Sequence, residues 1–148
     1  MNGPVPGTAA ERLERERSPE TGAQGRLAGR AVDRAVAPGE AERPAEVASL
    51  WAALEEVNDP ELPISLVDLG LIYDIRRGAE PGEVVVEMTF TAMGCPCTAF
   101  IRQDITERLL AEPEVESVLI EEVWSPAWRR DRMTGRGRAQ MREFGVSV

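Results

Sequence analysis

Apolar positions along the chain become regularly spaced only from about residue 46 onward. There they recur every three or four residues, the spacing that places side chains on one face of a helix, at Val47, Leu50, Trp51, Leu54 and Val57. The helix is predicted to end at Asn58-Asp59-Pro60, because the residue before a proline disfavours helical backbone. The folded part of the chain therefore begins with a helix that buries one stripe.

Two strands are expected next, over 69–75 and 83–91, with the turn residues Gly78 to Gly82 between them. In the second strand, apolar side chains occupy every other position and so share one face, at Val84, Val86, Met88 and Phe90. Two strands joined by such a short turn predict a β-hairpin.

A second helix is predicted from Thr98, as its N-cap, to about Ala111. Its expected inward-facing side chains are Phe100, Ile101, Ile105, Leu109 and Leu110. A third strand over 115–123 and a short helix over 134–143 follow, and the three tryptophans and Phe144 are expected to be packing anchors. This helix-strand-strand-helix-strand-helix order predicts an α/β (α+β) fold, a two-layer sandwich whose small mixed sheet carries its helices on one face.

Residues 1–45 have a different composition, rich in Ala, Gly, Pro, Glu and Arg and without an aromatic residue. Apolar side chains are too sparse there to bury a face, so we predict a disordered N-terminal arm over 1–45 and a folded domain over 46–148 that ends in a basic tail. No apolar run approaches the length of a membrane span, and no signal segment is recognisable. We expect a cytoplasmic protein.

The net charge and the amino-acid composition argue against several classes of function. The formal charge of -9 argues against nucleic-acid binding, which needs a basic face. The Arg129-Arg130-Asp131-Arg132 run is the exception, expected to be a solvated surface able to dock an acidic partner. Without histidine or lysine, the chain can form neither a histidine-based catalytic triad nor a Schiff base. Ordinary hydrolases and lysine-based enzymes are therefore disfavoured, and we expect a protein that is not an enzyme.

Cys95 carries the strongest chemical signal, because it lies where the second strand ends and the second helix is about to begin. A thiol there lies near free backbone N–H groups and the positive end of the helix dipole, which stabilise a thiolate. Such a thiolate is nucleophilic or metal-binding, whereas the alternative makes Cys95 a small buried apolar residue. Two cysteines in a Cys-poor chain indicate a reducing compartment.

Cys97 leaves three interpretations open: a second ligand to one soft metal, half of a strained disulfide, or a structural residue. A closed zinc or 2Fe–2S site takes about four ligands, and one chain offers only two cysteines. A metal shared by two subunits, a ligand set completed by carboxylates, or open and transient binding would each account for this shortage. Asp59, Glu61 and Asp68 could reach the Cys95 loop, although such residues are more often turn and cap residues.

Several short motifs, in this order, resemble the MIP18 family, formerly called the DUF59 domain. They are Asp59-Pro60-Glu61-Leu62, Val67 to Asp74, Met88 to Thr91 running into Gly94-Cys95-Pro96, Trp124 to Trp128, Asp131-Arg132-Met133 and Phe144-Gly145-Val146. The resemblance covers about residues 46–146. It implies an α/β domain that serves iron-sulfur cluster assembly or transfer, with the PaaD-like factors among its members.

The resemblance also assigns roles to residues. It implies that Cys95 is the functional cysteine, that Asp59 and Glu61 are acidic cleft residues, and that Thr91 is the threonine before the cysteine. The sequence departs from the family pattern at Cys97, where an apolar residue is usual.

The leading hypothesis is an accessory factor for iron-sulfur cluster assembly or transfer. Cys95 as thiolate would carry iron or a cluster transiently, with Cys97 as a second metal ligand, for delivery to client metalloproteins. One alternative is an adaptor that docks the assembly machinery to clients without holding metal. Another is a dithiol redox protein that uses Cys95 and Cys97. The sequence leaves a homodimer open, and neither nucleic acid nor a membrane is expected as a partner.

Overall fold

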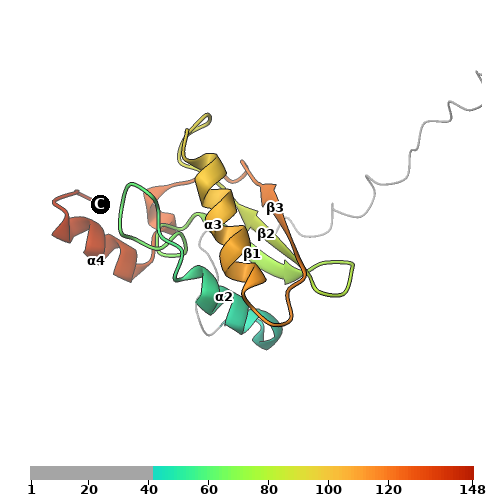
Figure 1. Cartoon of the computed structure of the whole chain (residues 1–148). Helices are drawn as coiled ribbons and strands as arrows, with labels where there is room; N and C mark the ends of the chain where they lie inside the picture. Colours follow the sequence, from blue (N-terminus) through green and yellow to red (C-terminus); the bar gives the residue numbers. More distant parts are fainter. Residues whose placement is uncertain (1–41) are drawn as a thin grey trace, which may run out of the picture. The chain divides into compact units, whose positions relative to one another are not determined.

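The computed structural model describes residues 42–148, and their centre is a three-stranded sheet in the order β1-β2-β3 (Figure 1). β1 (Ile72–Arg77) and β2 (Glu83–Met88) are antiparallel, which confirms the predicted hairpin. β3 (Ser117–Glu122) runs parallel to β2, so the sheet is mixed. The disorder predicted for residues 1–45 falls, apart from 42–45, outside the described residues.

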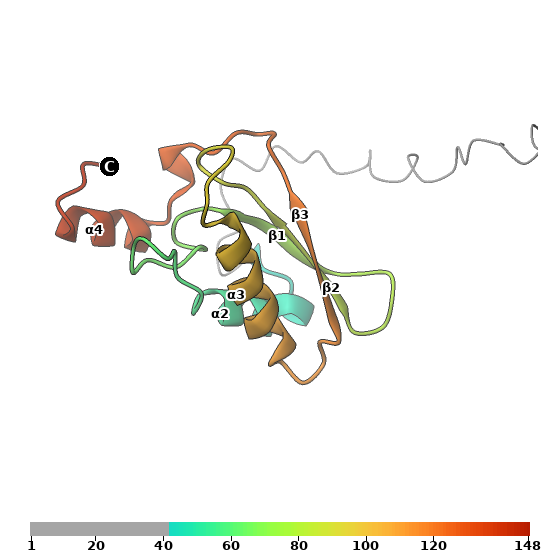
Figure 2. The same cartoon turned by 45° about the horizontal axis from the view of Figure 1, so that its top comes forward.

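Two helices cover one face of this sheet: α2 (Ala48–Leu54), which follows the short 3-10 helix η2 (Ala45–Val47), and α3 (Thr98–Leu110). Figures 1 and 2 show α2 and α3 side by side, and the two helices are in contact. α3 forms the crossover that joins the parallel strands β2 and β3. The predicted α+β fold and its element order are therefore confirmed, with boundaries shifted by a few residues.

After β3 the chain forms the 3-10 helix η3 (Arg130–Arg132) and the helix α4 (Gly135–Glu143). α4 lies beyond the layer of α2 and α3, on the side of the domain away from the hairpin turn (Figure 2). Within residues 42–148, no helix is long and apolar enough to cross a bilayer.

The core lies between the sheet and the helix layer. All five apolar residues of the first predicted helical stripe are buried, and so are the four that share a face of the predicted strand 83–91. α3 contributes Ile101, Ile105 and Leu109, which follow one another at four-residue spacing. Periodicity alone therefore located most of the core.

Four residues predicted to pack inward are largely exposed instead. Phe100 and Leu110 of α3 are 63% and 44% exposed, because each lies one residue, or about 100°, away from a member of the buried stripe. Trp124 and Phe144 are also exposed. The predicted role as packing anchor is confirmed for Trp51, which is fully buried, and for the partly buried Trp128, whose Nε1 donates to the Leu69 carbonyl at 2.8 Å.

The C-terminal segment is fastened to the loop before β1 through Asp68. This carboxylate is buried and accepts hydrogen bonds from Thr134 Oγ1 at 2.6 Å and from Arg136 Nε at 2.7 Å. Thr134 is the N-cap of α4, and its hydroxyl accepts from the Gly137 amide. We call Asp68, Thr134 and Arg136 the C-terminal anchor.

Arg132 strengthens the same attachment. It is only 2% exposed, and its guanidinium lies over the Tyr73 ring at 3.7 Å, a cation–π contact. Gly70 permits the close approach, because a Cβ at this position would lie 2.3 Å from the Arg132 carbonyl oxygen. The expected solvated surface is therefore confirmed for Arg129 and Arg130, which are exposed, and wrong for Arg132.

Candidate functional site

Both cysteines lie in the loop that joins β2 to α3, which projects at the N-terminal end of α3 (Figures 1 and 2). We call residues 91–97 the Cys loop. Thr98 is not the N-cap that the sequence predicted, because Cys97 occupies that position. Thr98 instead donates to the Cys95 carbonyl twice, from Oγ1 at 2.8 Å and from its backbone N–H at 3.2 Å. These hydrogen bonds fix the Cys95 backbone to the first turn of α3.

The two thiols are free and each is half-buried. Cys95 is therefore not the fully buried apolar residue of the alternative interpretation. Cys97 packs against the edge of the core, and its Sγ lies 3.9 Å from Glu61 Oε1. The site thus combines two sulfurs with a nearby carboxylate from the loop after α2.

Cys97 is held in its neutral form. Burial raises the pKa of the Cys97 thiol above its ordinary value, and interactions with Cys95, Glu61 and Asp59 raise this pKa further. Loss of the proton would place a negative charge beside the charges already present. A metal that binds Cys97 must displace this proton.

The three candidate carboxylates have separate roles. Glu61 reaches the thiol of Cys97, as described. Asp59 Oδ1 accepts hydrogen bonds from the amides of Glu61 at 2.8 Å and Leu62 at 3.1 Å, so it also shapes the turn that presents Glu61. Asp68 has its partners in the C-terminal anchor and not in the Cys loop.

The remaining site residue predicted from the sequence, Thr91, is exposed at the start of the Cys loop. Gly94, farther along this loop, has a φ of +76° and no atom within 4 Å of where a Cβ would lie. Glycine is therefore favoured there by the backbone conformation and not by crowding.

The ligand set in one chain is incomplete. Among residues 42–148, no group of three or more Cys, Asp or Glu side chains is arranged to hold a metal ion. The thiols of Cys95 and Cys97, with Glu61 nearby, fall short of the four ligands that a closed zinc or iron-sulfur site requires. The chemistry of the donors suits iron, whereas their number suits an open site.

Large apolar side chains around the thiols were missed as surface features by the sequence analysis. Met93 in the Cys loop is 80% exposed, and Phe100 follows in the first turn of α3. Trp124 comes just after β3 and lies 6.4 Å from Phe90 between ring centroids. The signal available in the sequence was the position of Phe100 beside Ile101, outside the four-residue spacing of the buried stripe.

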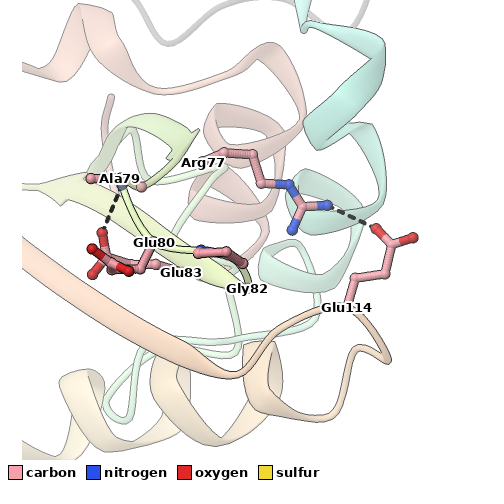
Figure 3. Close-up of a pocket in the computed structure, with 8 residues that line it drawn as sticks. Arg77, Ala79, Glu80, Gly82, Glu83 and Glu114 are labelled. Atoms are coloured by element: carbon pink, nitrogen blue, oxygen red, sulfur yellow. Dashed lines mark hydrogen bonds and ion pairs between the residues drawn. The ribbon is translucent and has the colours of Figure 1, made fainter.

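A shallow recess lies at the opposite end of β2, around the turn of the hairpin (Figure 3). Three of its charged side chains, those of Arg77, Glu83 and Glu114, already have partners. Arg77 Nη2 pairs with Glu114 at 3.0 Å, and Glu83 accepts a hydrogen bond from the Ala79 amide at 3.0 Å. The recess contains neither cysteine, so it does not compete with the Cys loop as a site for iron.

Comparison with known proteins assigns the chain to a family. The chain belongs to the iron-sulfur cluster assembly protein family, whose pattern matches residues 48–120. The resemblance to the MIP18 family seen in the sequence is therefore confirmed.

Two bacterial relatives are similar over most of their own length. The Fe-S protein maturation auxiliary factor YitW of Bacillus subtilis (strain 168) is 41% identical over 86 residues, which cover 58% of this chain and 83% of the relative. The Fe-S protein maturation auxiliary factor SufT of Staphylococcus aureus (strain USA300) is 41% identical over 78 residues, covering 53% and 88%.

A solved structure supports the fold independently. The crystal structure of a domain of unknown function, DUF59, from Bacillus anthracis is similar with a TM-score of 0.57 and 36% sequence identity. The similarity covers 67% of this chain and 91% of the other. The two domains therefore share the same three-stranded architecture.

Proposed function

We propose that this protein is an accessory factor in iron-sulfur cluster assembly, which carries iron or a cluster transiently on the Cys95 thiolate and delivers it to client metalloproteins. Membership of the family and the maturation role named for the relatives support the general role. The same relatives are maturation factors by name, which supports a carrier and not a catalyst. Location in the cytoplasm stays a prediction.

The observation that carries the proposal is the shortage of ligands around two accessible thiols. A protein that stores a metal surrounds it with a full ligand set, whereas a carrier must release its cargo. Two thiols and one carboxylate bind iron less firmly than a client that supplies three or four cysteines. Iron or a cluster would therefore move from the weaker site of this chain to the tighter site of the client.

Each site residue has a role in this scheme. Cys95, fixed through its carbonyl by Thr98, is the first ligand, and Cys97 becomes the second once its proton is displaced. Glu61 is placed to accept that proton or to approach the cargo, and Asp59 holds the turn that presents Glu61. Thr91 offers an exposed hydroxyl at the rim of the site.

Anaerobic reconstitution tests the proposal. The wild type, Cys95→Ser and Cys97→Ser are incubated with ferrous iron and sulfide, desalted and mixed with an apo-ferredoxin as the recipient. We expect bound iron and transfer in the wild type, loss of both in Cys95→Ser, and weaker retention in Cys97→Ser. Unchanged transfer by Cys95→Ser would contradict the proposal.

A second function, that of an adaptor between assembly machinery and clients, is favoured by the exposed Arg129 and Arg130. Charge reversal at both positions should then abolish partner capture, while Cys95→Ala retains it. Arg132 is left unchanged in this test because it is buried, and its reversal would disturb the fold. Transfer that survives reversal of both arginines but not Cys95→Ser would favour the carrier.

The dithiol redox alternative also remains a prediction. It requires a disulfide between Cys95 and Cys97 under mild oxidation, which mass spectrometry of alkylated protein detects.

A further inference from the structure

The incomplete ligand set raises the question of which groups complete it while the cargo is held. A carboxylate of the same chain does not complete the set, because among residues 42–148 no three Cys, Asp or Glu side chains, Glu61 included, are arranged to hold a metal ion. Asp68, the other carboxylate of the loop before β1, is committed to the C-terminal anchor. The missing ligands must therefore come from a second molecule.

We propose that iron makes two copies of this chain associate through their Cys loops, so that Cys95 and Cys97 of both copies hold the metal between them. This inference rests on the proposed function and adds a specific partner to it. A twofold axis through the metal would place the same surface of each copy against the other. Two copies of a two-cysteine site supply the four thiolates that one copy lacks.

The surface around the thiols has the composition of an interface. Three of the large apolar side chains that are exposed among the described residues lie at this end of the domain: Met93, Phe100 and Trp124. Arg102 of α3 pairs with Glu122 at the end of β3, which brings the first turns of α3 and the segment with Trp124 to the same end. Aromatic residues and methionine are enriched at the centres of protein interfaces.

Charge and area explain why association would need iron. Each copy brings Glu61 and Asp59 close to the thiols, so two apo copies would place like charges opposite one another. A stable interface usually buries at least about 1,200 Å², and three partly exposed side chains per copy supply only part of this area. One ferrous ion supplies two positive charges and four metal–sulfur bonds, with each of the four thiols releasing its proton to solvent, and these bonds offset the small area and the negative charge that remains.

The test measures mass and metal content together, without a client. The full-length wild type is titrated anaerobically with ferrous iron and followed by native mass spectrometry and sedimentation. We expect a monomer without iron, and a dimer that contains one iron per two chains when iron is added. Cys95→Ser should remove both the bound iron and the dimer.

Two variants of α3 provide a matched pair. Phe100→Asp places a charge on the proposed surface, whereas Leu110→Asp makes the same change at another exposed residue at the far end of the same helix. We expect Phe100→Asp to weaken the iron-dependent dimer at least about tenfold, which corresponds to roughly 1.4 kcal/mol, and Leu110→Asp to have no effect. Circular dichroism of both variants confirms that each is folded.

The possible failures are distinguishable. Iron bound to a monomer, one per chain, would overturn the shared site while leaving the carrier function intact. A dimer that forms without iron, or that Phe100→Asp leaves unchanged, would also overturn it. No iron bound by the wild type in any state would overturn the carrier function, and the shared site with it.

Discussion

Asp68 and Glu61 are two carboxylates from the same stretch of chain, and the structure gives them opposite surroundings. Asp68 is buried, with a hydroxyl and a guanidinium as hydrogen-bond partners. Glu61 is beside a neutral thiol, at 3.9 Å from its sulfur. A carboxylate whose charge is balanced stabilises the fold, whereas one without a cation beside it remains available to a ligand. The C-terminal anchor therefore stabilises the fold, whereas Glu61 and the Cys loop beside it form the candidate site.

The largest effect should come from Gly70, which has a positive φ and lies against the C-terminal segment. Gly70→Ala places a Cβ 2.3 Å from the Arg132 carbonyl oxygen, so the backbone must shift. We expect it to lower the free energy of unfolding by about 3 kcal/mol, from steric overlap added to left-handed strain. Urea denaturation measures the change.

Gly94→Ala is the matched control, because its φ is +76° and no atom lies within 4 Å of the added Cβ. Only left-handed strain remains, which costs about 1 kcal/mol. Equal losses in the two variants would mean that the close approach at Gly70 does not matter.

Removal of the Asp68 carboxylate should have the next largest effect. Asp68→Ala removes the acceptor of Thr134 Oγ1 and Arg136 Nε, and we expect a loss of about 2 kcal/mol in the free energy of unfolding, since Arg136 still pairs with Glu55 and can reach water. Glu61→Gln serves as the comparison and should change stability by less than about 0.5 kcal/mol. A larger loss for Glu61→Gln than for Asp68→Ala would reverse the assignment of the two carboxylates.

The smallest effect concerns proton binding at Cys97. Because the negative charge of Glu61 raises the pKa of the Cys97 thiol, Glu61→Gln should lower this pKa. The pH dependence of alkylation rates, measured in a Cys95→Ser background, reports the change. Glu114→Gln at the hairpin end is the control and should leave the profile unshifted.

The same shift has a consequence for stability. The folded state binds the Cys97 proton more tightly than the unfolded state, so this contribution to stability is present at neutral pH and is lost as the pH rises through the raised pKa. Cys97→Ser should therefore flatten the alkaline part of the stability profile. An unchanged profile would contradict the raised pKa.

The sequence predicted the features that depend on nearby residues better than those that depend on contacts between residues far apart in the chain. Spacing of apolar residues located α2, the buried face of β2 and the stripe of α3, because these depend on neighbours within a few positions. The role of Asp68 was not predictable, because its partner Arg136 is 68 residues away along the chain. For the same reason Arg132 looked like part of a solvated run, and its packing on Tyr73 became visible only in three dimensions.

The candidate site was predictable to a similar extent. Cys95 followed from its position between a strand and a helix, and Glu61 and Asp59 from their place before the first strand and from family resemblance. Their approach to Cys97 depends on the path of the loop after α2. The exposure of Met93 and Trp124 could not be read from hydrophobicity, which predicts burial for both.

The attachment of α4 through Asp68 also sets an order of events during synthesis. The sheet, α3 and the Cys loop use residues up to 122, so all of them leave the ribosome before Thr134 and Arg136 do. α4 has nine residues, too few to remain helical without packing. Asp68 therefore meets its partners only after Thr134 and Arg136 have also been released, and a nascent chain presents its cysteines before this attachment forms.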